Sequence, residues 1–299
     1  MSDLSNELTP LILTPGAVLS SRNIEDYPSG IIIPVDKPYR WTSADVIRKV
    51  KYAAIRYFRK KNLKVGHAGT LDPLATGVLL VCIGKATKLA ETLQSHDKEY
   101  IAGVTFGATT PSYDLEKEID RFFPHEHISA DVITSALPAF IGEQNQIAPL
   151  FSAKSVDGVR AYEIARKLYK SHDTQDLSLQ SEFDEAAQSL LRVSKINISE
   201  LELLDFSGHA STLPAEAAVQ ETSNASSRIN VNDNSALGLP VATIRMACSK
   251  GTYVRAFARD LGETLNSGAH LSSLQRSRSG EFRVEMALSV EQATSLLQA

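Results

Sequence analysis

Residues 66–79 read Gly-His-Ala-Gly-Thr-Leu-Asp-Pro-Leu-Ala-Thr-Gly-Val-Leu, and Asp72 is the only acid among them. Glycine lets a backbone approach a ligand closely or take a positive φ, and Pro73 removes an amide donor and stiffens the turn. The apolar run Val78–Ile83 follows at once and predicts a buried strand. An acid held on a rigid loop beside a buried element is a common arrangement for a catalytic group. From these residues alone, the alternative is that Asp72 only caps a turn.

Four further segments match one family together with this stretch, and they occur in the family's order between residue 30 and roughly residue 287. They are Val35-Asp36-Lys37-Pro38 with Trp41-Thr42-Ser43, then Lys98-Glu99-Tyr100, then Ser249-Lys250-Gly251-Thr252-Tyr253-Val254-Arg255, and finally Gly268-Ala269-His270-Leu271 through Leu274-Gln275-Arg276. With these segments and residues 66–77, the chain resembles the TruB family of tRNA pseudouridine synthases.

The resemblance implies the reaction and its catalytic residues. The family isomerises a uridine of tRNA, at position 55 of the T-loop, to pseudouridine after flipping the base out of the RNA. The resemblance assigns the attack on the ribose to Asp72, either as a nucleophile at C1′ or as a base at C2′. Arg255 is the expected cation beside Asp72, because a carboxylate buried against a base needs one to stay ionised. Tyr100 is expected to stack on the uracil and to take part in proton transfer at C5.

The resemblance also assigns seven substrate-binding positions. His67 is expected to contact RNA near the flipped base, Leu274 to form an apolar wall of the base pocket, and Asp114 to lie near the site. The set is Lys37, His67, Gly69, Leu71, Asp114, Lys250 and Leu274. Without the resemblance, Tyr100 is equally a half-buried strand residue, Leu274 a core residue and Arg255 a surface residue of a helix.

The net charge of −4 on 299 residues argues by itself against a nucleic-acid partner, but the charge is unevenly distributed. Residues 37–64 hold ten basic side chains against one acid, whereas residues 171–237 hold eleven acids against three bases. A clustered basic surface is typical of phosphate binding, and a solvated helix face is the alternative. Beside the motifs, the basic segment favours RNA.

The sequence gives no indication of a metal, a cofactor or a membrane. It contains no His-Glu-x-x-His, Cys-x-x-Cys or phosphate-binding Gly-x-x-x-x-Gly-Lys motif, and the isomerisation needs no oxidant or phosphate donor. Cys82 and Cys248 lie in apolar runs and are expected to be buried free thiols. With no signal peptide and no apolar stretch of membrane-spanning length, we expect a cytoplasmic protein that uses no cofactor and acts as a monomer on the T-arm stem-loop of tRNA.

The predicted strands and helices are mixed rather than strictly alternating, which favours an α+β fold around a mostly antiparallel sheet. The resemblance implies the same: the pseudouridine synthase fold, a mixed sheet with flanking helices and a central active-site cleft. The predicted strands are 30–35, 78–83, 100–106, 151–156, 193–206 and 241–248. The predicted helices begin with the capping-box pattern at 42–45 and continue with 85–93, 129–141, 162–169, 252–265 and 289–297.

We divide the chain into an N-terminal extension, a catalytic domain and a C-terminal helix, at 1–29, 30–288 and 289–299. Within the catalytic domain, residues 107–150 correspond to the segment that clasps the RNA stem-loop in the family. Two biased stretches, 171–191 and 207–238, are expected to be polar surface insertions.

Two alternatives to a T-loop synthase remain from the sequence. Many members of the family carry a C-terminal RNA-binding domain of the PUA type, and the residues after 288 are too few for one. The lack of that domain and of a Lys-rich tail argues against a guide-RNA-dependent synthase. An RNA chaperone would not need Asp72, Tyr100 and Arg255, although chaperoning of tRNA folding could accompany catalysis.

Overall fold

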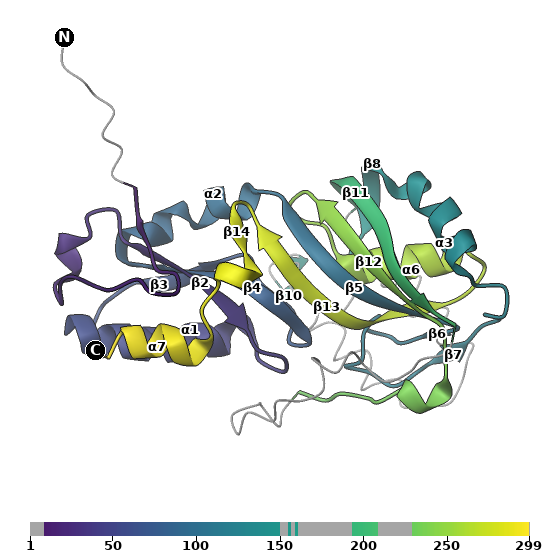
Figure 1. Cartoon of the computed structure of the whole chain (residues 1–299), viewed down its shortest axis with the longest axis horizontal. Coiled ribbons are helices and arrows are strands. Elements are labelled where there is room, and N and C mark those ends of the chain that lie inside the picture. Colours follow the sequence, from purple (N-terminus) through teal and green to yellow (C-terminus); the bar gives the residue numbers. More distant parts are fainter. Residues whose placement is uncertain (1–8, 150–154, 157–158, 161–192, 209–228, 299) are drawn as a thin grey trace, which may run out of the picture. The chain divides into compact units, whose positions relative to one another are not determined.

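The computed structural model describes residues 9–149, 155–156, 159–160, 193–208 and 229–298, drawn as a coloured ribbon in Figure 1. These residues divide into two units. The first holds residues 9–101, 229 and 274–298, and the second holds the other described residues from 102 to 273. Two strands, β5 (Lys98–Phe106) and β13 (Ala269–Ser279), contribute residues to both units.

The strand pairings are mostly antiparallel, with parallel pairs only between β1 and β2 and between β13 and β4 among those described. The other strands are β1 (Leu11–Ile12), β2 (Ile31–Lys37), β3 (Val65–Ala68), β4 (Ala75–Ile83), β6 (Ala108–Thr109), β7 (Arg121–Phe122), β8 (Gly142–Ile147), β9 (Ser155–Val156), β10 (Val159–Arg160), β11 (Val193–Ser207), β12 (Val241–Cys248) and β14 (Phe282–Arg283). The helices are α1 (Ser43–Phe58), α2 (Ala90–Ser95), α3 (Ala130–Ala136), α6 (Val254–Thr264) and α7 (Val290–Leu296), with 3₁₀ turns η1 (Ile24–Asp26), η2 (Gly84–Leu89), η3 (Leu137–Phe140), η4 (Ser235–Leu237) and η5 (Val284–Met286). The predicted α+β class with a mixed, mostly antiparallel sheet is confirmed.

Strand β4 is the centre of the first unit. One edge pairs antiparallel with β2, from Ile31 opposite Ile83 to Lys37 opposite Gly77. The other edge is shared, because β3 pairs with its second half and residues 274–276 of β13 pair with its beginning. The loop that joins β3 to β4, residues 69–74, contains Asp72 and is called the Asp72 loop below.

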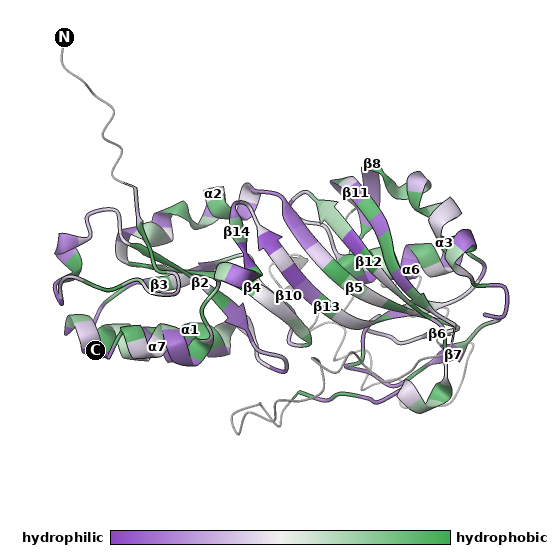
Figure 2. Ribbon diagram, in the orientation of Figure 1, coloured by the Kyte–Doolittle hydropathy of each residue, from purple (hydrophilic) through white to green (hydrophobic). Residues whose placement is uncertain are grey.

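Both faces of β2 and β4 are buried, so the first unit has helices on each side. Successive strand side chains point to opposite faces, and Leu79 and Val81 lie in one apolar cluster whereas Val78 and Leu80 lie in another. Helices α1 and α7 cover the first face and η2 with α2 covers the second, as Figure 1 shows. Figure 2 shows the apolar colour concentrated on these strands.

The sequence explains where α1 begins and ends. Thr42 accepts a hydrogen bond from the Asp45 amide while the Asp45 carboxylate accepts from the Thr42 amide, so the predicted capping box is confirmed. Arg59, with φ 51°, ends the helix in the left-handed region. In between, Val46 and Val50 are fully buried on the face toward β2 and β4.

The second unit contains β8, β11 and β12 as neighbouring antiparallel strands. Helix α6 is fixed to β8 by Gln146, whose amide group donates to the Tyr253 carbonyl at 3.1 Å and accepts from the Tyr253 amide at 2.8 Å. These two hydrogen bonds to the backbone of Tyr253 position the first turn of α6, where Arg255 lies. Phe257 of the same helix packs edge-on against Phe140.

Several predicted elements have different boundaries in the structure. The predicted helix 129–141 is α3 followed by the 3₁₀ turn η3, because Pro138 has no amide proton with which to continue the α-helical hydrogen bonds. The predicted helix 85–93 begins as η2 and becomes α2 only at Ala90. The stretch treated as one loop, 66–77, is strand at both ends and loop only at 69–74.

Other predictions fall wholly or partly outside the described residues. The helix 162–169 and the insertion 171–191 lie there entirely. Most of the insertion 207–238 also lies there. Residues 207–208 and 229–238 of it are described; Ser207 ends β11, and residues 229–238 contain η4. Among the described residues, no helix is long and apolar enough to cross a membrane. Cys82 and Cys248 are free and buried, as predicted.

Candidate active site

The Asp72 loop is anchored at its centre to the start of α1. Leu71 is buried, its amide donates to the Ser43 hydroxyl at 2.9 Å, and that hydroxyl donates back to the Leu71 carbonyl at 3.1 Å. The Ala75 amide then donates to the Asp72 carbonyl at 3.1 Å and closes the turn into β4. Asp72 itself is half-buried. Its backbone is therefore held on both sides of the carboxylate-bearing residue.

Lys37 lies beneath this loop and is fully buried. Its ammonium donates to the carbonyls of Pro38 at 2.9 Å, Trp41 at 2.6 Å and Pro73 at 3.2 Å. Burial lowers the pKa of Lys37 to about 7, against the opposing effect of the Asp72 and Asp36 carboxylates. Lys37 thus joins β2, the turn before α1 and the residue after Asp72.

Arg276 is a second buried cation of the loop, 1% exposed. Its Nε donates to the Val78 carbonyl at 2.7 Å, and its two terminal nitrogens donate to the carbonyls of Gly69 at 3.0 Å and Thr70 at 3.4 Å. A planar guanidinium suits several acceptors in fixed directions. It therefore fixes the entry of the Asp72 loop against β4.

A glycine is required where β4 meets β13. Gly77 has φ +96°, and a Cβ there would lie 2.2 Å from the carbonyl oxygen of Arg276. The Gly77 amide donates to the Asp36 carboxylate at 3.0 Å. Burial raises the pKa of Asp36, and this amide and Lys37 oppose the rise. This hydrogen bond joins Asp36, the residue before Lys37, to β4, the strand that follows the Asp72 loop.

Three more predicted residues lie in the first unit near this framework. His67, on β3, is half-buried, and its Nδ1 has no hydrogen-bond partner within the described residues. Burial and, to a lesser degree, the Arg276 charge lower the pKa of His67, so the ring is neutral near pH 7. Tyr100 and Leu274 are both half-buried and pack on the apolar cluster that also contains Leu71.

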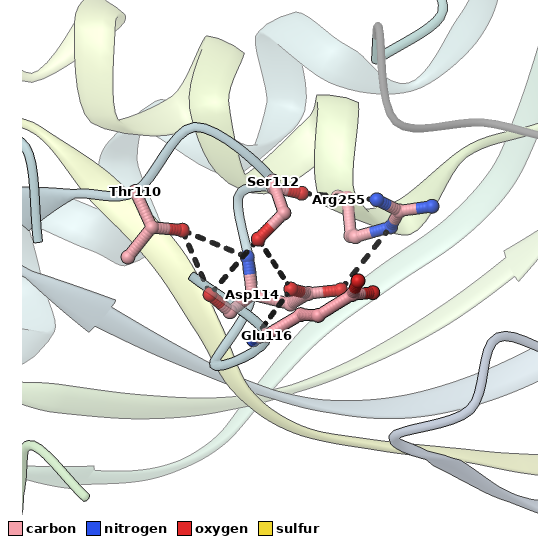
Figure 3. Close-up of polar contacts among 5 residues, drawn as sticks. All are labelled: Thr110, Ser112, Asp114, Glu116 and Arg255. Carbon is pink, nitrogen blue, oxygen red and sulfur yellow. Dashed lines mark hydrogen bonds and ion pairs between the residues drawn. The ribbon is translucent and has the colours of Figure 1, made fainter. Parts of the chain in front are cut away.

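Arg255 belongs to a polar cluster of the second unit, drawn in Figure 3. It is 4% exposed, its Nε lies 3.7 Å from an Asp114 carboxylate oxygen, and a terminal nitrogen donates to the Ser112 carbonyl at 3.0 Å. Asp114 also accepts from the Ser112 hydroxyl at 2.6 Å and from the Glu116 amide at 2.9 Å. The structure therefore gives Arg255 a carboxylate partner that the sequence did not predict. Pairing of Arg255 with Asp72, in the other unit, stays a prediction.

The turn at 110–116 is stiffened by its own side chains. The Thr110 hydroxyl donates to the Asp114 carbonyl at 2.7 Å and accepts from the Asp114 amide at 3.1 Å, as Figure 3 shows. Tyr113, inside the turn, has φ 55°. This closed set of bonds holds the Asp114 carboxylate against Arg255. By contrast, the predicted substrate-binding residue Lys250 is exposed on the turn between β12 and α6.

Sequence reasoning missed the residues that support the site rather than those proposed to react. Arg276 lies in a matched motif but was assigned no role, since nothing in the sequence distinguishes it from Arg278 two positions later. Ser43 could have been noticed, because it follows the helix cap Thr42 in the same motif. In the part of the chain that the structure describes, no group of three or more His, Cys, Asp or Glu side chains could hold a metal ion.

Comparison with known proteins places the chain in a family. A family model described as "TruB family pseudouridylate synthase (N terminal domain)" matches residues 56–178. A tRNA pseudouridine synthase B from Phocaeicola vulgatus is 46% identical over 266 residues, which cover 89% of this chain and 92% of that protein. One from Thermus thermophilus is 39% identical over 258 residues, which cover 86% of this chain and 75% of that protein.

Solved structures share the fold at lower identity. A chain of a Cbf5–Nop10–Gar1 complex is 22% identical with a TM-score of 0.55, covering 97% of this chain. A chain of an H/ACA ribonucleoprotein bound to a substrate RNA is 20% identical with a TM-score of 0.52, covering 96% of this chain. The chain spans 64% and 62% of the lengths of those two chains. With the full-length sequence matches, we conclude that the chain belongs to the TruB family of pseudouridylate synthases.

Proposed function

We propose that this chain isomerises uridine to pseudouridine in tRNA, at position 55 of the T-loop, with Asp72 as the catalytic residue. The single observation that carries the proposal is the Asp72 loop. One carboxylate stands on a turn fixed by Ser43, Lys37 and Arg276, in a chain 46% identical to a tRNA pseudouridine synthase B. A preorganised carboxylate is what the reaction needs, because breaking the N1–C1′ bond starts with a nucleophile at C1′ or a base at C2′ of the ribose.

The reaction conserves every atom of the nucleotide. The N1–C1′ bond breaks, the uracil rotates, a C5–C1′ bond forms, and the proton lost from C5 is replaced by one gained at N1. Asp72 acts at the ribose, either by adding to C1′ or by removing the C2′ proton. In either form, a detached uracil carries negative charge, so cations and hydrogen-bond donors around it stabilise the intermediate. Neither form requires a cofactor.

The other predicted residues take positioning and binding roles in this proposal. Tyr100 stacks on the flipped uracil, its phenol assists proton transfer at C5, and Leu274 forms an apolar wall beside it. Arg255 supplies the positive charge that keeps Asp72 ionised, and Asp114 orients Arg255 through the ion pair in the second unit. The remaining contacts to RNA come from His67, Gly69 and Lys250. Lys37 and Leu71, predicted as further contacts, are buried and instead hold the Asp72 loop in place.

The proposed partner is the T-arm stem-loop of tRNA, engaged by one copy of the chain in the cytoplasm without a guide RNA. Base flipping costs a few kcal/mol, which base stacking in the pocket and phosphate contacts offset. The names of the relatives in Phocaeicola vulgatus and Thermus thermophilus support tRNA as the substrate.

The test uses purified protein and an unmodified tRNA transcript, with no other RNA, EDTA present and no nucleotide added. We expect pseudouridine at position 55 alone, detected by base-resolution chemistry. A transcript with cytidine at position 55 is the control and should remain unmodified. A requirement for a second RNA, or modification at a different uridine, would contradict the proposal.

A further inference from the structure

A hollow of about 520 Å³ opens on the first unit at the beginning of β3. Its lining includes Lys51 of α1, Lys61, Asn62 and Lys64 of the turn before β3, Gly66 of β3 and Thr87 of η2. Strand β3 runs from this hollow to Ala68, after which the Asp72 loop begins. The hollow and the loop are therefore at opposite ends of one short strand.

Three ammonium groups give the hollow its charge. Lys51, Lys61 and Lys64 are exposed, and their side chains have no ion pair or hydrogen bond within the described residues. No carboxylate is among the described residues that line the hollow. The positive charge here is therefore not neutralised by the protein itself.

Three other basic residues of segment 37–64 have partners within the protein. Arg48 forms an ion pair with Asp45, and Lys60 forms one with Glu25 at 2.5 Å. Arg56 donates to the Tyr52 hydroxyl at 3.3 Å and lies over that ring. The structure thus divides a basic run that looks uniform in the sequence into cations with a partner among the described residues and cations without one, and three of the latter meet at the hollow.

We propose that the hollow binds phosphodiester oxygens of the RNA backbone while another nucleotide of the same RNA occupies the Asp72 site. Ammonium groups bind phosphates as point charges without reading the base, and the Asn62 amide can donate to a phosphate oxygen. The inference rests on the proposed function, which identifies the RNA as tRNA. It adds a second point of attachment, remote from the catalytic loop along β3.

An extended polyanion fits this hollow better than a small anion. Each exposed ion pair contributes at most about 1 kcal/mol, because water and salt screen it, so one free phosphate would bind weakly to three solvated ammonium groups. A polynucleotide instead brings several phosphates together and releases its condensed counterions when they are neutralised. Affinity from this source falls steeply with salt concentration, which gives a direct readout.

The test compares two triple variants with the same change in net charge. The hollow variant carries Lys51→Gln, Lys61→Gln and Lys64→Gln, and the control carries Arg48→Gln, Arg56→Gln and Lys60→Gln. Binding of unmodified tRNA is measured between about 50 and 200 mM salt in full-length protein that also carries Asp72→Asn, so that no turnover occurs. The rate of pseudouridine formation at saturating tRNA is measured with Asp72 intact.

We expect the hollow variant to bind tRNA about ten- to a hundredfold more weakly and to lose about two to three units from the slope of log affinity against log salt. The control should lose less than one unit, and both variants should keep the wild-type rate at saturating tRNA. If the two variants lost equal tRNA affinity and equal salt dependence, the effect would come from net charge alone, and the proposal would be overturned. If inorganic tripolyphosphate protected the hollow lysines from acetylation while tRNA did not, a small-anion site would replace it. Failure of the wild type to form pseudouridine would instead refute the proposed function, because binding is scored separately.

Discussion

Two buried cations hold the Asp72 loop by its backbone. Lys37 donates to the carbonyl after Asp72, and Arg276 donates to the carbonyls of Gly69 and Thr70 at the loop's entry. Removing the donor for a buried carbonyl leaves that group unsatisfied, which costs roughly 1–3 kcal/mol. At the residue scale, the loop therefore depends on these two side chains for its shape.

Replacing Arg276 with Lys should slow catalysis more than it weakens tRNA binding. An ammonium cannot reach three carbonyls spread over the Asp72 loop and β4, so the loop loses its fixed entry. A displacement of about 1 Å can cost roughly a hundredfold in rate. We expect a ten- to hundredfold lower kcat, measured as pseudouridine formed per enzyme at saturating tRNA. The control is Arg278→Lys, since Arg278 donates to the Gly280 carbonyl rather than to the loop. Equal rates of the two variants would show that Arg276 has no positioning role.

Lys37 should make the stability of the protein depend on pH above neutrality. Burial lowers the folded-state pKa of Lys37 to about 7, from the 10.5 of a solvated lysine. Between those values the unfolded chain binds a proton that the folded chain lacks, so the free energy of unfolding rises with pH, by up to about 1.4 kcal/mol per unit. The rise levels off above the unfolded-state pKa, and below pH 7 both states are protonated.

The measurement is urea unfolding of the wild type and Lys37→Met at pH 6, 7, 8 and 9. Because the two proteins share their other titrating groups, their difference in free energy isolates Lys37. We expect this difference to move in favour of the wild type from pH 7 to 9 and to change much less from pH 6 to 7. A difference that did not vary with pH would mean that Lys37 keeps its ordinary pKa.

At this scale the motifs in the sequence supplied the residues but not their contacts. Lys37 and Asp72 stand in matched segments, so a site containing both was predicted. The Arg255–Asp114 ion pair joins residues more than a hundred positions apart, and no local pattern links them. The hydrogen bonds of Arg276 to three carbonyls could not be predicted from the sequence either, because they depend on β13 lying beside β4.

The elements that the sequence predicted well are those with a strong local pattern. Helix α1 has a capping box and an apolar face, and β4 is a continuous apolar run, so both were found close to their observed bounds. The strands β8 and β13 were missed because they are rich in polar residues and lack alternation. Their strand structure comes from partners far along the chain: β8 pairs with β11, and β13 pairs with β4.

Gly77→Ala tests whether the contact between β4 and β13 shapes the element that follows Asp72. The new Cβ would lie 2.2 Å from the Arg276 carbonyl oxygen, so the strands must separate locally. We expect thermal and urea unfolding to show a loss of more than about 3 kcal/mol, beyond the roughly 1–3 kcal/mol of an unfavourable positive φ.

The matched control is Gly16→Ala in the same unit. Gly16 has φ +86°, but nothing lies within 4 Å of its added Cβ, so it measures the cost of the backbone conformation alone. If the two variants lost equal stability, the close approach at Gly77 would contribute nothing.

The whole molecule divides the candidate residues between two units. Asp72, Lys37 and Tyr100 lie in the first, whereas Arg255 and Asp114 lie in the second. Each unit fixes its own members by buried hydrogen bonds, so each set is preorganised on its own. The motifs predicted these residues as members of one site but not their division between two units, whereas the mixture of strands and helices predicted the fold class.

Charge is the other property of the whole molecule that the sequence reported only in part. The net charge of −4 hides a basic segment at 37–64, and the structure further separates paired from unpaired cations within it. Since phosphate contacts depend on unpaired charge, the proposed phosphate site is placed where three cations unpaired within the described residues, Lys51, Lys61 and Lys64, meet.

The most direct test of the central claim, catalysis by Asp72, is single-turnover conversion of a tRNA transcript by the wild type and by Asp72→Asn. Asparagine keeps the shape of the side chain and loses the basic, nucleophilic oxygen. We expect the variant to form pseudouridine at position 55 at least about a thousandfold more slowly while binding the transcript with nearly the wild-type affinity. An Asp72→Asn protein that bound tRNA and still converted position 55 within tenfold of the wild-type rate would contradict the account.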